Sequence, residues 1–241
     1  MKRFLLTGEG TENLDDKKFS SHHKIGKIAD YLLWDRQFIA ELKQIEGYPS
    51  VRMNRLMNEA LRQEPRIFIA GTVGMQRVLA GRENGAEINE MMVTIGGRPV
   101  RKMLQHANSQ ISDTRLKLQL AGAAGLAIVL IDKPQKIEAS IAAYAVRAAL
   151  QANEPALKEV DVVWVSMETH QVALPDGRLG YPELIVWRAN RRSTMERYMM
   201  GQMIDAWAQF NDADLENLDH TLGWHTLNPI GSGWPLSLQQ E

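Results

Sequence analysis

Apolar residues recur along the chain with two different periods, and together these periods predict helices alternating with strands. Short runs of β-branched and aromatic residues predict strands at residues 27–34, 37–45, 66–70, 126–131, 160–165 and 183–187. Helical spacing predicts helices over residues 50–64, 137–152 and 193–210, and a long helix that follows Pro99. Because helices fall between strands, we expect an α/β fold in which helices flank a mixed central β-sheet.

The remaining segments have weaker patterns. Residues 11–24 are polar and are predicted to form a short helix followed by a loop, and residues 72–96 are predicted to form short helices joined by loops. Ser193 is expected to cap the last helix, with Glu196 three residues on as its partner. No linker or repeat divides the chain, so residues 1–241 are predicted to form a single domain with an irregular tail from about 218 to 241.

Composition narrows the function classes without choosing one. Hydrophobic residues make up 44% of the chain and charged residues 24%, which is typical of a soluble globular protein and excludes a disordered one. Cysteine is absent, so disulfides, thiolate metal sites and a cysteine nucleophile are excluded. No apolar stretch approaches the roughly 18 residues of a membrane span, and the N-terminus lacks the apolar core of a signal peptide. We therefore expect a cytoplasmic protein with no membrane partner.

The most informative segment is the predicted hairpin at residues 27–45. A two-residue turn at Asp35-Arg36 places Asp30 directly across from Glu41, with the two Cβ atoms about 5 Å apart on one face of the sheet. Lys43 follows Glu41 by two residues and therefore points to the same face. Apolar residues surround this cluster of two carboxylates and one ammonium.

Two opposed carboxylates repel each other, so a fold keeps them at low cost only when a cation lies between them. Lys43 supplies one positive charge. A hard divalent ion fits better, because Mg²⁺ favours one or two carboxylates together with water and phosphate oxygens. Such an ion acidifies a bound water and neutralises charge on a phosphoryl group. The pattern therefore predicts metal-assisted hydrolysis of a phosphodiester.

The residues Ala29-Asp30 and Glu41-Leu42-Lys43, on the two strands of a hairpin, resemble the motif of the PD-(D/E)XK nuclease superfamily, whose fold is that of the restriction endonucleases. The resemblance implies a restriction-endonuclease-like core and a catalytic set of Asp30, Glu41 and Lys43. Asp30, Glu41 and the backbone carbonyl of Leu42 would bind Mg²⁺ or Mn²⁺, and Lys43 would serve the attacking water. Ala29 stands where the family usually has proline.

The close resemblance covers roughly residues 25–46, and beyond them only the order of elements agrees. The family often adds an acidic ligand from a helix before the hairpin, and Glu12 is the candidate here, with Asp16 behind it. An arbitrary pattern of this kind most often marks a hairpin with solvated charges, and that interpretation stays open.

Two basic clusters are candidates for contacts with nucleic-acid phosphates. One lies beside the predicted site, and the other lies near the start of the last helix. The first contains Lys17, Lys18, Lys24 and Lys27, of which Lys24 and Lys27 are the preferred contacts. The second contains Arg188, Arg191, Arg192 and Arg197, of which Arg191 and Arg192 are preferred. A solvated charged face is an equally good interpretation of the arginines.

Other chemical candidates are better explained without a function. His22-His23 is interpreted as part of a solvated loop, and the Gly71 to Gly74 segment lacks the frame of a phosphate-binding loop. Ser166 lacks the nucleophile elbow of a hydrolase. Three polar residues of the long helix either face the cleft or, as the preferred interpretation, lie on the surface: Gln105, Asn108 and Gln110.

The sequence thus predicts a divalent-metal-dependent nuclease that hydrolyses phosphodiester bonds, with DNA as the expected substrate. Nucleases that cut both strands are commonly dimers, so a homodimer is one expectation. The net charge of -1 argues against a protein coated in DNA-binding positive potential, although a local basic cleft remains compatible with it. Two alternatives therefore stay open: a non-catalytic module of this fold that binds nucleic acid or protein, and an assembly protein of a phage or mobile element.

Overall fold

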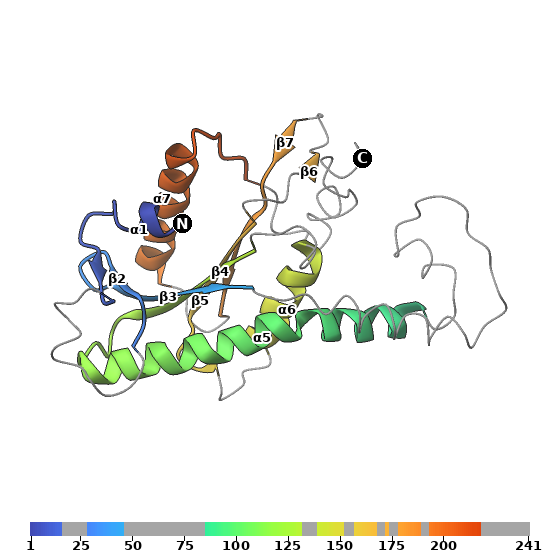
Figure 1. Cartoon of the computed structure of the whole chain (residues 1–241), viewed down its shortest axis with the longest axis horizontal. Coiled ribbons are helices and arrows are strands. Elements are labelled where there is room, and N and C mark those ends of the chain that lie inside the picture. The colour runs from blue at the N-terminus through green and yellow to red at the C-terminus, as the bar shows by residue number, and fades with distance from the viewer. Residues whose placement is uncertain are drawn as a thin grey trace.

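Six strands form one open mixed sheet at the centre of the computed structural model (Figure 1). The sheet order is β1-β2-β3-β4-β5-β8, in which β3, β4 and β5 are parallel and β2 and β8 run antiparallel to them. The strands are β1 (Glu12–Asn13), β2 (Tyr31–Leu33), β3 (Phe38–Gln44), β4 (Ala124–Leu130), β5 (Val162–Ser166) and β8 (Glu183–Trp187). The structure describes residues 1–15, 28–45, 85–131, 139–151, 157–167, 172–173, 178–188 and 193–217.

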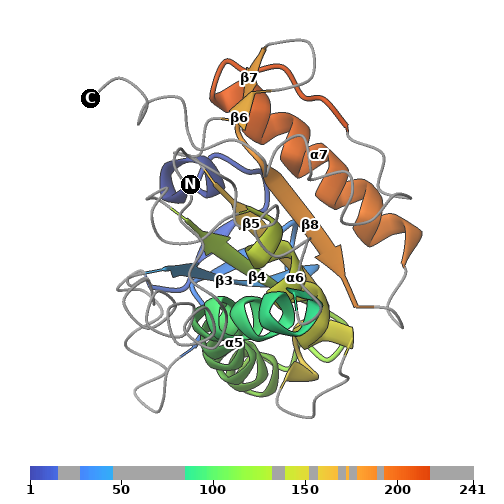
Figure 2. The ribbon, with the colours of Figure 1, turned by 90° about the vertical axis from the view of Figure 1, so that its right-hand side faces the viewer.

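Helices cover both faces of this sheet and give the molecule three layers (Figure 2). One face is covered by α5 (Gly85–Lys117) and α6 (Ala139–Gln151), and the other by α1 (Lys2–Leu5) and α7 (Thr194–Phe210). Strands β6 (Val172–Ala173) and β7 (Leu179–Gly180) form a separate two-stranded sheet. The predicted α/β class, with a mixed sheet flanked by helices, is therefore confirmed.

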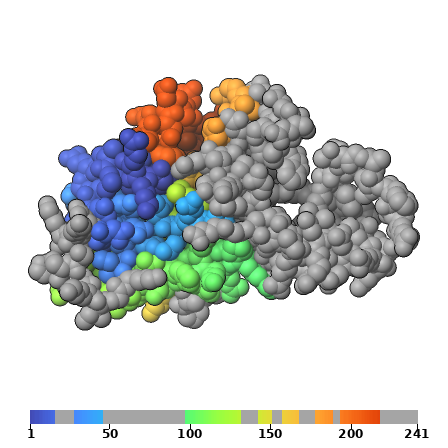
Figure 3. All heavy atoms as spheres, in the orientation of Figure 1, coloured from blue at the N-terminus to red at the C-terminus, as the bar shows by residue number. Residues whose placement is uncertain are grey.

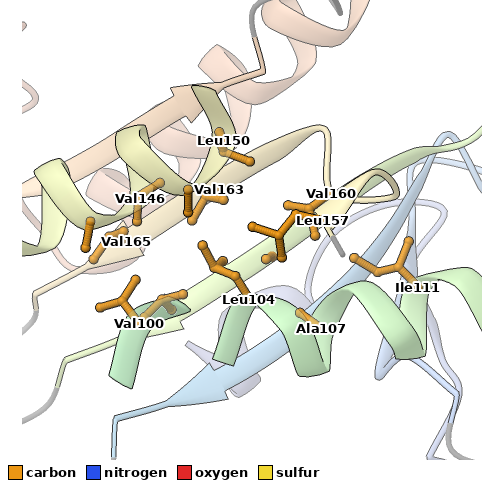
Figure 4. Close-up of a cluster of buried hydrophobic side chains, with 14 of the residues drawn as sticks. Val100, Leu104, Ala107, Ile111, Val146, Leu150, Leu157, Val160, Val163 and Val165 are labelled. Atoms are coloured by element: carbon orange, nitrogen blue, oxygen red, sulfur yellow. The ribbon is translucent and has the colours of Figure 1, made fainter. Parts of the chain in front are cut away.

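Side chains of the central strands alternate between two hydrophobic cores. On β5, Val163 and Val165 face α5 and α6, whereas Val162 and Trp164 face α1 and α7. Figure 4 shows the first core, in which Leu104 of α5 lies among valine and leucine side chains of the sheet and of α6. Because both faces are covered, β4 is apolar throughout, as is typical of a buried parallel strand.

Helix α5 begins well before the predicted position. The sequence predicts a start after Pro99, but α5 runs from Gly85 to Lys117 with Pro99 inside it. A proline in a helix interior costs about 3 kcal/mol or more, so tertiary packing must override it. Gly97 provides part of that packing, because a Cβ there would lie only 2.6 Å from the Cβ of Ala145 on α6. The glycine therefore lets the two helices approach closely.

Several other predictions can be compared with the structure. Strand β8 has the predicted bounds, and α7 begins after Ser193, whose Oγ accepts a hydrogen bond from the backbone N–H of Glu196 at 3.3 Å. The helix predicted within residues 11–24 is wrong for Glu12 and Asn13, which form β1 and pair with β2. The helix at 50–64, the strand at 66–70 and the tail at 218–241 lie outside the described residues.

None of the helices in the described part of the chain combines the length and the apolar character needed to cross a membrane.

The helix that matters for the candidate site is α5, which packs against β3 and β4. In the space-filling view of Figure 3, the N-terminal residues, the β2–β3 hairpin and α5 form neighbouring bands on one face. This arrangement brings the C-terminal part of α5 against the hairpin, where Gln110 and Thr114 make hydrogen bonds to it.

Candidate active site

The β2–β3 hairpin has the register that the sequence predicts. Its strands pair Tyr31 with Ala40 and Leu33 with Phe38, and one further step along this register places Asp30 opposite Glu41. The N–H of Gln37 donates to the carbonyl of Trp34 at 3.0 Å and closes the turn, in which Trp34, Asp35 and Arg36 have φ angles of 48°, 48° and 67°. Positive φ at both central residues is what a two-residue type I′ turn requires, and this turn suits the twist of a hairpin.

The two acids are fixed by backbone donors across the hairpin. The N–H of Asp30 donates to Glu41 Oε2 at 3.1 Å, and the N–H of Leu42 donates to Asp30 Oδ2 at 2.8 Å. Each carboxylate therefore takes its orientation from the opposite strand. Because the N–H and C=O of one strand residue point to the same side, the carbonyl of Leu42 also points toward Asp30.

Lys43 completes the predicted cluster and also contacts Gln110 of α5, a residue for which the sequence favoured a place on the surface. Its Nζ donates to Glu41 Oε1 and, at 2.6 Å, to Oε1 of Gln110 on α5. The side chain of Lys43 is 24% exposed, whereas that of Glu41 is only 1% exposed. The ammonium thus lies at the solvent side of a buried carboxylate. Gln110 was expected on the surface, and its contact with Lys43 shows that this expectation is wrong.

Helix α5 holds the segment just before β2 through two polar residues one helical turn apart. The Nε2 of Gln110 donates to the carbonyl of Ile28 at 3.1 Å, and Oγ1 of Thr114 accepts from the N–H of Ala29 at 2.7 Å. The hydroxyl of Thr114 in turn donates to the carbonyl of Gln110 at 2.7 Å. A proline at position 29, the usual residue of the resembled motif, would lack the N–H that Thr114 receives. Alanine at position 29 therefore allows a hydrogen bond to Thr114 that proline could not make.

Burial dominates the electrostatics of the acid pair. Loss of hydration raises the pKa of Glu41 to about 7; the hydrogen bond from Lys43 opposes this rise, and the charge of Asp30 adds to it. Burial also raises the pKa of Asp30, with the N–H of Leu42 opposing the change and the charge of Asp15 adding to it. The single ammonium of Lys43 does not offset the cost of two ionised carboxylates. A further positive charge bound at the site would therefore stabilise the ionised forms of both acids.

Glu12 does not join this pair. It lies on β1 rather than on a helix, and its carboxylate is held by the guanidinium of Arg36, with Nε 2.6 Å from Oε1 and Nη2 3.0 Å from Oε2. Within the described ranges, no three His, Cys, Asp or Glu side chains are gathered in a way that could hold a metal ion. The acid whose charge reaches Asp30 is instead Asp15, which the sequence argument passed over.

The predicted phosphate contacts are only partly visible. Lys24, Lys27, Arg191 and Arg192 lie outside the described residues, as do His22, His23 and Asp16. Arg188 is buried, and its guanidinium donates to the backbone carbonyls of Val160, at 3.0 Å, and Leu157. A guanidinium bound in this way serves the fold, so the interpretation of Arg188 as a phosphate contact is wrong.

No family model, curated protein or solved structure matches this chain. The function must therefore be argued from the geometry of the hairpin and α5.

The donor set of this site fits a hard divalent cation. Mg²⁺ is held in proteins by one or two carboxylates, with water and substrate phosphate oxygens completing its shell, so a third acid is not required. Asp30 and Glu41 supply two carboxylates whose orientation is already fixed, and strand geometry turns the Leu42 carbonyl to the same side as the Leu42 N–H that Asp30 accepts. Burial raises the pKa of Glu41 to about 7, so a cation bound at the pair would stabilise its ionised form. Lys43 lies beside these two carboxylates, with its ammonium paired to Glu41.

Proposed function

We propose that this chain is a divalent-metal-dependent nuclease of the PD-(D/E)XK type, with a restriction-endonuclease-like core, that hydrolyses phosphodiester bonds in DNA. One observation carries the proposal: the half-buried carboxylate of Asp30 and the buried carboxylate of Glu41 lie opposite each other, each fixed by a backbone N–H of the other strand, with the ammonium of Lys43 alongside. The connection from this hairpin through a long helix to a parallel strand supports the same assignment.

The chain's own residues have separate tasks in this proposal. Asp30, Glu41 and the Leu42 carbonyl hold a divalent ion, which supplies a more acidic water and charge neutralisation at the phosphoryl group. Lys43 donates to the attacking water or to a phosphoryl oxygen, where its positive charge offsets the negative charge that grows in the transition state. Glu41 is fully buried, so the surrounding protein keeps bulk water from its side of the site, and the lower local dielectric strengthens these interactions.

A plasmid-nicking assay tests the activity. Purified wild-type protein should nick or degrade DNA in the presence of Mg²⁺ or Mn²⁺, and Asp30→Asn and Lys43→Met should each reduce the rate by more than about 100-fold. Asp205→Asn on α7 and Lys102→Met on α5 are matched controls, because both residues are exposed and remote from the hairpin acids in sequence. Wild-type rates in Asp30→Asn and Lys43→Met would assign the cleavage to a contaminant or to another site.

Calorimetric titration with Mn²⁺ tests the metal site without activity. Wild-type protein should bind Mn²⁺, whereas Asp30→Asn should lose the binding and Asp205→Asn should keep it. Absence of Mn²⁺ binding in the wild-type protein would overturn the proposal and favour a non-catalytic module, in which Lys43 alone balances Glu41. Parallel assays on duplex DNA, single-stranded DNA and RNA test the choice of DNA as substrate.

A further inference from the structure

Gln110 links helix α5 to β3 and to the segment that leads into β2 at the candidate site. Its side-chain oxygen accepts from Nζ of Lys43 at 2.6 Å, and its side-chain nitrogen donates to the carbonyl of Ile28 at 3.1 Å. The orientation of the amide follows from its neighbours, because an ammonium can only donate and a carbonyl can only accept. Gln110 therefore has two specific partners, one on each side of the acid pair.

Thr114 makes this link rigid. It lies one helical turn beyond Gln110, so both side chains emerge from the same face of α5. Its hydroxyl accepts from the N–H of Ala29 and donates to the carbonyl of Gln110, each at 2.7 Å. Thr114 and Ala29 are both fully buried. The backbone that leads into Asp30 and the amide that holds Lys43 are thus fixed to a single turn of one helix.

Lys43 needs such a partner because its other partner is one of the proposed metal ligands. A lysine ammonium sits on a flexible four-carbon stem, so its position depends on the acceptors around it. In this structure those acceptors are Glu41 and Gln110. Once the Glu41 carboxylate is shared with a divalent ion, Gln110 is the acceptor that keeps Nζ beside the site. Being neutral, it does so without adding a third negative charge next to Asp30 and the buried Glu41.

We propose that Gln110 is a positioning residue for the reaction, which acts by holding the ammonium of Lys43 at the acid pair. This inference rests on the proposed nuclease function. It assigns to α5 a part in catalysis that the hairpin motif does not contain.

The test compares Gln110→Leu with Gln105→Leu, a matched change at an exposed glutamine of the same helix. Removing a partner that orients a catalytic group typically costs 10- to 100-fold, so Gln110→Leu should lower kcat by about 10-fold or more. The Mn²⁺ dissociation constant should change by less than about threefold, because both carboxylates remain. Gln105→Leu should match wild type in both measurements.

A second measurement requires neither metal nor substrate. In protein carrying ¹⁵N-labelled lysine, NMR reports how fast the ammonium protons of Lys43 exchange with water. Gln110→Leu should accelerate this exchange, whereas Gln105→Leu should not. If Gln110→Leu proves unstable, Gln110→Glu keeps an acceptor for Lys43 and should keep the exchange slow. Wild-type exchange and wild-type kcat in Gln110→Leu would overturn the inference.

The two proposals fail in different ways. The nuclease proposal fails if wild-type protein neither binds Mn²⁺ nor cleaves DNA, and the exchange rate of the Lys43 ammonium has no bearing on that result. The Gln110 proposal fails if the wild-type protein is an active enzyme but Gln110→Leu leaves both kcat and the Lys43 exchange rate unchanged. A lower kcat accompanied by an unchanged Lys43 exchange rate would also count against it, because the effect would not pass through the ammonium.

Discussion

Two partly buried polar clusters lie beside helix α5, and they balance charge in opposite ways. The first, which we call the Arg115 cluster, contains Arg115, Glu159 and Asp161. Arg115 donates to both carboxylates and, at 2.8 Å, to the carbonyl of Ala123, while Asp161 also accepts from the N–H of Gly125 at 2.8 Å. Lys158 lies 3.7 Å from Glu159 and adds a further positive charge.

The second, the hairpin cluster, contains Asp30, Glu41, Lys43 and Gln110. It has two acids and one ammonium, its fourth member is neutral, and burial raises the pKa of both acids. The comparison shows why one cluster is structural and the other is a candidate site. The Arg115 cluster is charge-balanced by protein groups and fixes the ends of strands, whereas the hairpin cluster gains stability from a cation that the chain does not provide.

The largest effect on stability is expected from a substitution that breaks the Arg115 cluster. Asp161→Ala should lower the free energy of unfolding by about 3 kcal/mol, because it leaves the buried N–H of Gly125 without its acceptor and removes a buried carboxylate that interacts with the guanidinium groups of Arg115 and Arg188. Asp30→Ala should cost about 1 kcal/mol or less, because the fold disfavours its ionised form. Urea denaturation at pH 7.5 measures both. Equal losses in the two variants would remove the distinction between the clusters.

Divalent cations should stabilise the hairpin cluster selectively. Mn²⁺ at about 100 times its dissociation constant should raise the free energy of unfolding of wild-type protein by about 2.7 kcal/mol, provided that the unfolded chain does not bind it. The same addition should leave Asp30→Asn unchanged, because one of the two proposed ligands is lost. Urea denaturation with and without Mn²⁺ gives the result. A matching gain in Asp30→Asn would place the bound ion elsewhere.

Without metal, the hairpin cluster should make stability fall as pH rises. Since the pKa of Glu41 is about 7 in the folded protein and near 4.5 in the unfolded chain, the folded protein holds a proton that the unfolded chain has lost between these values. The free energy of unfolding should therefore decrease from about pH 4.5 and level off above about pH 8. The difference between the folded and unfolded pKa values of Glu41 corresponds to about 3 kcal/mol of stability. Asp30 contributes in the same direction, because burial also raises its pKa.

Glu41→Gln provides the check on this pH dependence. The variant should lose most of the decline and exceed wild type by about 2 kcal/mol above pH 8, because the amide loses one hydrogen bond worth about 1 kcal/mol but carries no charge. Urea denaturation between pH 5 and 8.5 follows both proteins. A wild-type stability that rises across this range would contradict the argument, as would a Glu41→Gln variant with the same decline as wild type.

The hairpin was predictable from sequence because local chemistry determines it. Alternation of apolar residues sets the two strands, and a two-residue turn then fixes which residues oppose each other, so Asp30 and Glu41 meet by arithmetic alone. The cap at Ser193 is predictable for the same reason, since its partner lies only three residues away.

The helix side of the site was not predictable in this way. Whether Gln110 faces the hairpin or the solvent depends on how α5 packs over the sheet, and one amide looks like another along an isolated helix. The start of α5 was missed because Pro99 reads as a boundary until the close approach of Gly97 to α6 is known. Glu12 was assigned to a helix because its pairing with β2 joins residues 20 positions apart in the chain. Long-range contacts thus decide what local patterns leave open.

The smallest expected effect concerns the connection between α5 and the hairpin. Thr114→Val keeps the side-chain shape but leaves the buried N–H of Ala29 without an acceptor, so the free energy of unfolding should fall by about 1 to 2 kcal/mol. Ala29→Pro removes the donor of the same hydrogen bond, so the two changes should not be additive. In the double variant, Ala29→Pro should cost about 1 kcal/mol less than it does in wild type. Urea denaturation of the four proteins measures this coupling. A coupling near zero would show that the hydrogen bond does not stabilise the fold, and that alanine at position 29 has another cause.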